Sequence, residues 1–322
     1  MVQAIPVALA CLLAIAASAA HAQAYPNRPV RIIDAFPAGG AGDVIARIMA
    51  PRLTEVLGQP VVVENRPGAG GNIGAEFAAR AAPDGYTMFM GVTSVLAPSR
   101  SLYPKLPYDA LRDFAPVSRA GSGAYMLVAH PSLPVRSVKD LVQLAKANPG
   151  QLKYASGGVG SGQHLAGEFF RSRTGTNLTH VAYKGGPPAV IAVTSGESEI
   201  GFVTVTSGLA QVNAGRMRAL AVTSPKRMAT LPNVATVAES GYPGFEITPV
   251  FGFYVPVATS KDIVAQLNAA IGKVIGMSEI RERFAAQAVE PAGSTPAELG
   301  AILASEIALW AKVIKAGGIR ID

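Results

Sequence analysis

Short runs of β-branched residues alternate with longer amphipathic segments along most of this chain, and this alternation constrains the fold more than any other feature. Residues 30–36 have the composition of a strand, and residues 43–57 have the apolar spacing of a helix. The same order returns with a strand at 61–64, a helix at 72–81 and a third strand at 86–90. Such alternation is typical of α/β domains with a parallel sheet and right-handed crossovers.

The middle of the chain repeats this alternation with a separate start. The expected strands are 152–155, 178–183, 199–203 and 219–223, and the expected helices are 137–147, 163–173, 187–195 and 207–214. Extended stretches at 116–130 and 245–255 flank this block, and the remaining C-terminal part is predicted to form helices at 263–275, 278–287 and 296–315.

Two extended stretches around a middle block predict a chain that crosses into a second domain and crosses back. We therefore predict two α/β lobes joined by two crossing strands, with a ligand cleft between them. The first lobe would contain residues 25–124 and 245–322, and the second lobe residues 125–244. A single large sheet with additional elements is the alternative.

The first 24 residues have the layout of a secretory signal peptide. Residues 4–20 are almost entirely apolar, and Ala20-His21-Ala22 and Ala22-Gln23-Ala24 each offer a small-x-small cleavage site. A transmembrane helix is the alternative, but the apolar run is shorter than the roughly 20 residues of a membrane span. Cys11, the only cysteine, lies in this segment, so cleavage predicts a secreted protein without thiols or disulfides, which can tolerate an oxidising compartment.

The composition favours a large core and excludes some partners. Hydrophobic residues make up 49% of the chain and charged residues only 15%, which argues against disorder. The formal net charge is +7, but the 28 Lys and Arg residues are scattered and are not interleaved with aromatic residues. We therefore predict no nucleic-acid partner and only a weak attraction for anionic solutes.

The turn between the first strand and the first helix is a candidate anion site. It covers residues 36–43, with the sequence FPAGGAGD. Turns of this kind lie at the carboxyl ends of parallel strands, where ligands bind. The glycines allow close backbone approach, and the helix N-terminus offers N–H groups and partial positive charge to a carboxylate. We expect Asp43 to cap the helix rather than to contact a ligand.

Four further strand-to-helix turns would face the same cleft. They are 91–94 (GVTS), 156–164 (SGGVGSGQH), 183–187 (YKGGP) and 203–207 (VTVTS). The second of these is the most glycine-dense, and its serines would supply hydroxyl donors to a second anion cradle unless the loop is only flexible. Lys184 could pair with an anion or be solvated, and the hydroxyls of the last turn could bind a ligand or only cap the next helix.

No motif predicts catalysis, a metal or a bound nucleotide. Residues 67–74 (PGAGGNIG) approach the dinucleotide fingerprint, but the third glycine falls one residue late and the acidic residue about 20 positions on is missing. The histidines His130, His164 and His180 have no metal-binding spacing. We predict no catalytic residue, metal or cofactor, although distant residues can form a triad without any motif, and His164 is the one histidine to test as reactive rather than packed.

Seven short segments in a fixed order carry a resemblance to a known family. They are YPNRPV (25–30), FPAGG (36–40), VENRPGAGGN (63–72), APDGYT (82–87), HLAGE (164–168), YKG (183–185) and LAVTS (220–224). In this order they resemble the Bug-type (TctC-like) solute receptors of the tripartite tricarboxylate transporter family. The resemblance implies a type II-like periplasmic binding-protein fold whose two lobes close on a ligand by hinge motion.

The resemblance also implies which residues grip a small mono-, di- or aromatic carboxylate, partly through water. In the first lobe they are Phe36, Ala38, Gly39, Gly40, Ala41, Thr93 and Ser94, and in the second lobe Ser156, Gly160, Ser161, Gly162 and Tyr183. We add Thr204 from the last turn. The chain has Ser161 where the family often has threonine, and Val203 where many members have aspartate, which favours a plainer or more apolar acid over an amine-bearing ligand.

These observations predict a periplasmic receptor that captures a small carboxylate solute and delivers it to the membrane subunits of a secondary transporter. We expect it to be a monomer. A periplasmic sensor that presents its closed form to a signalling partner would need the same clamp. A secreted hydrolase is a further alternative and would need a general base within reach of a nucleophile.

Overall fold

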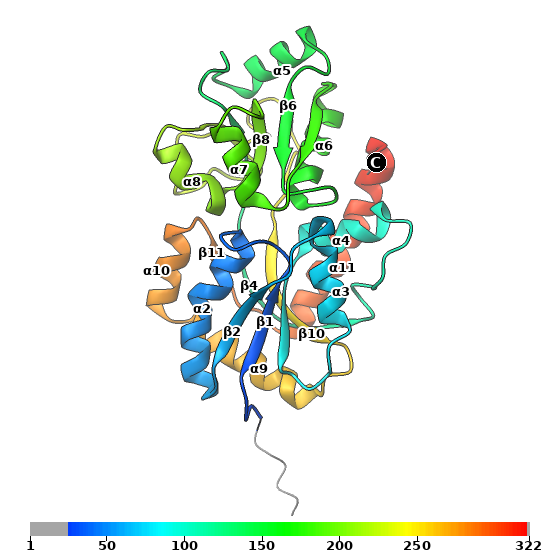
Figure 1. The fold of residues 1–322 in the computed structure, drawn as a ribbon, viewed down its shortest axis with the longest axis vertical. Helices are drawn as coiled ribbons and strands as arrows, with labels where there is room; N and C mark the ends of the chain where they lie inside the picture. The colour runs from blue at the N-terminus through cyan, green and yellow to red at the C-terminus, as the bar shows by residue number, and fades with distance from the viewer. Residues whose placement is uncertain (1–24, 321–322) are drawn as a thin grey trace, which may run out of the picture.

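The computed structural model describes residues 25–320 as two α/β lobes stacked along the long axis of the molecule (Figure 1). The predicted signal peptide, residues 1–24, lies outside the described residues. Each lobe has its own sheet, so the prediction of two α/β lobes is confirmed and the single large sheet is wrong. None of the helices between residues 25 and 320 is both long and apolar enough to cross a membrane.

The first lobe surrounds a six-stranded sheet within the described chain, with the strand order β11-β4-β10-β3-β1-β2. Its strands are β1 (Val30–Asp34), β2 (Val61–Asn65), β3 (Thr87–Val92), β4 (Phe114–Ser122), β10 (Val250–Pro256) and β11 (Glu290–Pro291). Strands β1, β2 and β3 are parallel, whereas β10 runs antiparallel to both β3 and β4. The helices of this lobe are α2 (Ala41–Leu57), α3 (Asn72–Ala79), α4 (Thr93–Leu102), α9 (Lys261–Ile275), α10 (Ser278–Ala286) and α11 (Pro296–Gly317).

The second lobe surrounds a five-stranded sheet, again counted over residues 25–320, with the order β7-β6-β8-β5-β9. Its strands are β5 (Tyr125–Ala129), β6 (Lys153–Ser156), β7 (Thr179–Ala182), β8 (Ile200–Thr204) and β9 (Arg218–Val222). Its helices are α5 (Val138–Ala147), α6 (Gly162–Thr174), α7 (Gly186–Thr194) and α8 (Val205–Asn213). Strands β6, β7 and β8 are parallel, so their carboxyl ends lie at one edge, which faces the first lobe.

Two chain segments connect the lobes, and they lie side by side. The first passes directly from β4 to β5, and the second returns from β9 to β10. Val250 at the start of β10 pairs with Ser122 at the end of β4. The buried Thr223 joins the two segments, because its hydroxyl accepts a hydrogen bond from the Tyr125 N–H (3.0 Å) and donates one to the Ile247 carbonyl (2.7 Å).

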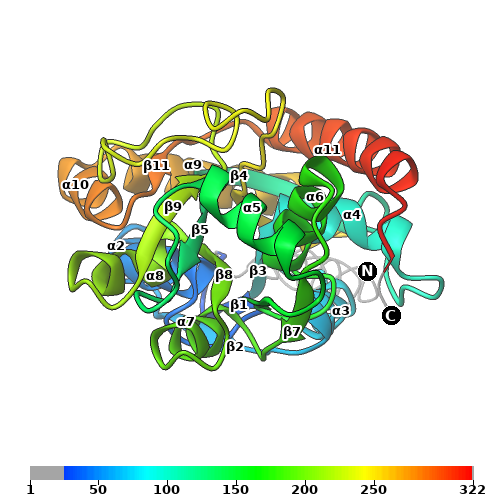
Figure 2. The ribbon, with the colours of Figure 1, turned by 90° about the horizontal axis from the view of Figure 1, so that it is seen from above.

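Helix α11 forms a further contact between the lobes. It begins in the first lobe with a capping box, in which Thr295 and Glu298 satisfy each other's backbone N–H groups. It then runs alongside α4 and reaches α6 of the second lobe (Figures 1 and 2). There Trp310 packs edge-on against Phe169, with ring centroids 6.4 Å apart.

Helix α4 is the element that the sequence analysis missed. We expected a turn at residues 91–94, whereas a helix begins at Thr93. Its short length and the proline at position 98 hide the helical pattern. The other predicted helices end within a few residues of their observed ends, but the extended stretch at 116–130 is split into β4 and β5 at the crossing.

Candidate ligand-binding site

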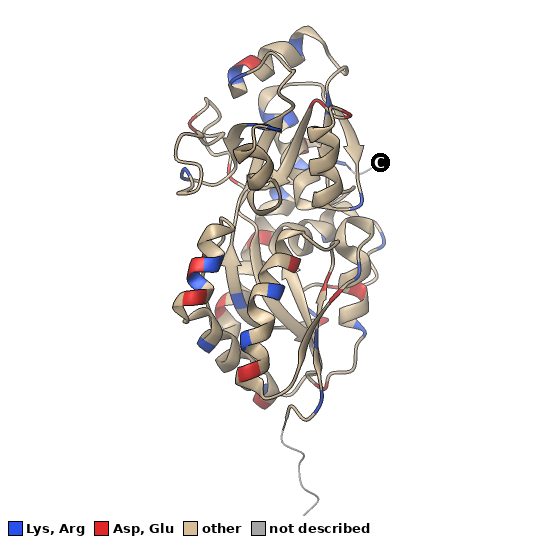
Figure 3. Ribbon diagram, turned by 60° about the vertical axis from the view of Figure 1, so that its left-hand side comes forward, with Lys and Arg blue, Asp and Glu red and all other residues tan. Residues whose placement is uncertain are grey.

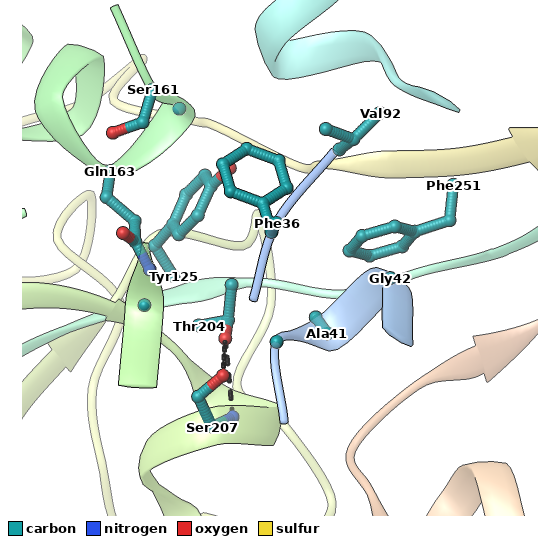
Figure 4. Close-up of a pocket in the computed structure, with 13 residues that line it drawn as sticks. Phe36, Ala41, Gly42, Val92, Tyr125, Ser161, Gln163, Thr204, Ser207 and Phe251 are labelled. Carbon is teal, nitrogen blue, oxygen red and sulfur yellow. Dashed lines mark hydrogen bonds between the residues drawn. The ribbon is translucent and has the colours of Figure 1, made fainter. Parts of the chain in front are cut away.

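A cavity of about 40 Å³ lies between the two lobes, where the strand-to-helix turns of both lobes meet (Figure 4). The residues that line it are Phe36, Gly40, Ala41, Gly42, Val92, Tyr125, Ser161, Gly162, Gln163, Gly186, Thr204, Ser207 and Phe251. In the described part of the chain, five helices begin at this wall, namely α2, α4, α6, α7 and α8. The cavity therefore faces the positive ends of several helix dipoles.

Backbone N–H groups at these helix ends are available to a ligand. In α2 the first intrahelical hydrogen bond runs from the Val44 N–H to the Gly40 carbonyl, which leaves the N–H groups of Ala41 and Gly42 without a partner in the helix. In α6 the side chain of Ser161 caps the His164 N–H, which leaves those of Gly162 and Gln163. Each lobe thus has two such N–H groups at residues that line the cavity.

No charged side chain contributes to the cavity wall among the described residues that line it. Acidic and basic residues are instead scattered over both lobes, without a block of either sign (Figure 3). An anion in the cavity would therefore be neutralised by backbone N–H groups and helix dipoles, each dipole contributing about 0.3–1 kcal/mol. No group of three or more His, Cys, Asp or Glu side chains suited to a metal ion occurs among residues 25–320.

The other side of the cavity is apolar. Phe36, Val92 and Phe251 of the first lobe line it, and Tyr125 approaches from the crossing strand β5 (Figure 4). The free space of about 40 Å³ exceeds the roughly 10–15 Å³ that a cavity needs to hold one water molecule, and the aromatic rings lie next to it.

A network below the first-lobe turn fixes its conformation. The prediction that Asp43 caps α2 as its N-cap is wrong, because Gly40 is the N-cap and Asp43 is the third helical residue. Its carboxylate instead reaches back to the Gly39 N–H (3.0 Å) and also accepts hydrogen bonds from Asn65 and Arg47 (both 2.9 Å). Burial raises the pKa of Asp43, but these hydrogen bonds outweigh burial and hold the pKa below its usual value.

Asp34, at the end of β1, lies behind the same turn. Burial and the nearby charge of Asp43 raise the pKa of Asp34 well above its usual value. The side chain of Asp34 leaves no room for a Cβ atom at Gly42, so this position of the cavity wall requires glycine. A raised pKa favours the neutral carboxyl, which reduces repulsion of an anion in the cavity.

Two hydroxyls of the second lobe connect the cavity wall to the first lobe. Thr204 donates to the Ser207 hydroxyl (2.8 Å), and Ser207 donates to the Gly39 carbonyl across the lobe boundary (3.3 Å). Val203 precedes them but has a fully buried side chain in the core of the second lobe. The expectation that Val203 shapes the choice of ligand is therefore wrong, because consecutive strand residues point to opposite faces and Thr204 takes the cavity side.

Gln163 is a lining residue that the sequence analysis did not select. The residue as a whole is only 6% exposed, and its side-chain amide has no hydrogen bond to any other described residue. The amide atoms are not fully buried, so a ligand or water in the cavity can supply their hydrogen bonds. Gln163 therefore offers a donor and an acceptor to a molecule in the cavity.

The structure brings six of the thirteen predicted ligand-binding residues to the cavity wall. They are Phe36, Gly40, Ala41, Ser161, Gly162 and Thr204. The lining residues that were not selected are Gly42, Val92, Tyr125, Gln163, Gly186, Ser207 and Phe251. Most of these are neighbours of predicted positions, but Tyr125 and Phe251 belong to the crossing strands, for which the turn pattern carries no signal.

The other predicted residues lie behind the wall or beside it. Ser94 is buried and its hydroxyl contacts the Tyr125 hydroxyl at 2.7 Å, while Thr93 accepts from the Val250 N–H at 3.3 Å. Ala38 is exposed in the first turn. Tyr183 lines a neighbouring space of about 290 Å³ between the lobes, which shares Phe36 with the main cavity.

The remaining three predicted residues form hydrogen bonds within the loops or across the lobe boundary. Gly39 contributes its carbonyl to the contact with Ser207. Ser156 and Gly160 are held from behind by histidines, at 2.6 and 3.1 Å respectively.

The lobes touch around the cavity through glycines. A Cβ atom on Gly70 would overlap the Val159 carbonyl oxygen, and one on Gly185 would overlap the side chain of Pro37. Beside these contacts Tyr103 of the first lobe donates a hydrogen bond to the Val159 carbonyl of the second lobe (3.0 Å). The two lobes are therefore in direct contact beside the cavity.

Comparisons with known proteins agree with this geometry. The profile of the tripartite tricarboxylate transporter family receptor matches residues 45–319. Protein BugT of Bordetella pertussis is 39% identical over 306 residues, which cover 95% of this chain and 94% of BugT.

Solved structures give the same result. Rpa4515 of R. palustris with adipate superposes with a TM-score of 0.89 at 35% identity, covering 92% of this chain and 99% of that one. MatC from Rhodopseudomonas palustris with bound malate has a TM-score of 0.86 at 28% identity, covering 90% and 100%. This fold and family are those of solute-binding receptors rather than enzymes. The chain belongs to the periplasmic receptors of the tripartite tricarboxylate transporter family, as the resemblance predicted.

Proposed function

We propose that this protein closes around a small carboxylate solute in the periplasm and delivers it to the membrane subunits of a tripartite tricarboxylate-type transporter. The observation that carries the proposal is the convergence of helix N-termini from both lobes on one uncharged cavity. Binding across the cleft would make the closed form more favourable than the open one.

The cavity accounts for recognition of a carboxylate without a lysine or arginine. Oxygens between α2 and α6 can accept from the N–H groups of Ala41 and Gly42 and from those of Gly162 and Gln163. Hydrogen bonds to a charged acceptor contribute about 1.5–3 kcal/mol each, so a few of them together with apolar contact reach the roughly −8 kcal/mol of a micromolar complex.

The apolar wall favours an acid with a hydrocarbon part. The rings of Phe36 and Phe251 offer dispersion and hydrophobic contact to such a skeleton. The bound adipate of Rpa4515 and the bound malate of MatC support small aliphatic acids as the class to test.

We assign residues 25–124 and 245–322 to the first lobe and residues 125–244 to the second, with the hinge where β4 and β10 leave the first sheet. The pairing of Val250 with Ser122 and the Thr223 hydrogen bonds support a hinge at this place. The predicted signal peptide supports export to the periplasm, and we propose that the protein works as a monomer.

A thermal-shift screen of the mature protein against small carboxylates tests the proposed function. We expect adipate, malate or a related acid to raise the melting temperature by several degrees, because a ligand at about 100 times its Kd adds about 2.7 kcal/mol. The primary amide of the same acid should produce no shift, since it lacks the charge that the helix N-termini stabilise. Equal shifts by acid and amide, or no shift by any acid at millimolar concentration, would contradict the proposal.

A charge placed at Gln163 should prevent binding. Q163E brings a second carboxylate into the cavity, and two unit charges about 4 Å apart repel by about 4 kcal/mol at an effective dielectric constant of about 20. We expect the affinity for the best acid of the screen to fall at least about a hundredfold by calorimetry. Q163L is the matched control and should stay within about tenfold of the wild type; the same loss in both variants would argue against an anion at this position.

The closed form should require glycine at position 70. G70A puts a Cβ atom against the second lobe, whereas G58A has the same left-handed backbone (φ of +63° and +69°) but nothing within 4 Å. Both variants carry a similar backbone strain of about 1–3 kcal/mol. We expect only G70A to weaken acid binding and to keep a larger radius of gyration in small-angle scattering with acid present. Unchanged binding by G70A would show that the lobes do not close in this way.

A further inference from the structure

A stack of three aromatic rings lies behind the glycine-rich turn of the second lobe. The rings of His164 and His180 are 4.0 Å apart at an angle of 20°, and Tyr154 stacks on the other face of His180 at 4.8 Å. The three side chains come from α6, β7 and β6. None of them lines the ligand cavity, as far as the described residues define it.

Each histidine holds one end of the turn that carries the cavity wall. The Gly160 N–H donates to Nδ1 of His164 at 3.1 Å. Nε2 of His180 lies 2.6 Å from the Ser156 hydroxyl, which in turn accepts from the Gly158 N–H at 3.2 Å. The residues that follow directly, Ser161 and Gly162, line the cavity.

We propose that His164 and His180 are positioning residues, whose neutral imidazoles hold residues 156–161 so that the N-terminus of α6 points at the bound carboxylate. The role of the two histidines in ligand binding rests on the proposed function, whereas their hydrogen bonds to the turn do not. The histidines act through the turn and do not contact the ligand themselves.

The hydrogen bond from Gly160 fixes the tautomer of His164. Because Nδ1 accepts, the ring proton lies on Nε2, which is 3.9 Å from the Glu168 carboxylate. Protonation would put a second N–H opposite the Gly160 N–H and would break this hydrogen bond. The hydrogen bond between Gly160 and His164 therefore requires a neutral ring.

The surroundings of the two rings favour their neutral form near neutral pH. The charged and titratable groups that face the stack are Tyr154 from β6 and Glu168 and Arg171 from α6. Glu168 is already bound by the Tyr154 hydroxyl (2.5 Å) and by Arg171 (2.8 and 2.9 Å), so it is not free to stabilise an imidazolium. Burial, with Arg171, lowers the pKa of His164 to about 4.

His180 follows the same direction. Burial and then His164 lower the pKa of His180 to about 3, against a smaller opposite effect of Glu168. Since the folded pKa values lie below the usual value of about 6.5, the order of the turn should be present near neutral pH and should be lost as the pH falls toward about 4.

Amide hydrogen exchange in the ligand-free protein tests the proposal independently of any ligand. We expect H164L, which keeps a similar volume without an acceptor, to accelerate exchange of the hydrogen-bonded amides of Gly158, Gly160 and Ser161 by about tenfold or more. H164N should restore slow exchange, because its side-chain oxygen can accept in place of Nδ1. H130L changes a histidine outside the stack and should leave this segment unchanged.

The outcomes separate positioning from packing. If H164N accelerates exchange as much as H164L, or if neither does, the hydrogen bond does not hold the turn and the proposal is wrong. Should H164L fail to fold, nitrogen NMR of the wild-type histidines decides: an Nε2-protonated His164 near neutral pH supports the proposal, and an Nδ1-protonated ring overturns it. If the turn responds to these variants as expected but the protein binds no acid, the proposed function is wrong. The positioning role of the histidines in the turn would still stand.

Discussion

Unpaired backbone N–H groups at the beginnings of helices are the constraint on which this structure depends. They occur on both lobes, at Ala41 and Gly42 and at Gly162 and Gln163, and closing the lobes removes them from bulk water. A buried donor without an acceptor costs about 1–3 kcal/mol, so several of them would oppose closure of the empty clamp. An anion that accepted from both lobes would remove this cost, so under the proposed function the ligand stabilises the closed form.

Other features of the molecule follow from that arrangement. The crossing segments lie side by side at Thr223, which is where we propose the hinge between the lobes. Glycines at the lobe boundary allow close contact around the cavity, Gly70 with the backbone of Val159 and Gly185 with the ring of Pro37. A buried network lies behind each turn, Asp43 with Asn65 in the first lobe and the histidine stack in the second. These networks fix the orientation of the N–H groups before a ligand binds. Preorganisation of this kind reduces the entropy lost on binding.

The sequence predicted the parts of the site that local pattern determines. The alternation of strands and helices placed Phe36, Gly40 and Gly162 at the carboxyl ends of parallel strands, and the structure brings them to the cavity wall. Tyr125 and Phe251 could not be predicted in this way, because they lie on strands where only the pairing of β5 with β8 and of β10 with β3 and β4 decides which side chains face the cleft. Val203 and Thr204 show the same limit of sequence-based prediction. They are consecutive in one strand, yet the side chain of Val203 lies in the core and Thr204 lines the cavity.

A crystal structure of the complex with the acid that gives the largest thermal shift tests the central claim most directly. We predict that the carboxylate oxygens lie about 3 Å from the N–H groups at the starts of α2 and α6, with no lysine or arginine side chain in contact. A carboxylate paired with Lys184, or an acid bound outside the space between the lobes, would contradict the account.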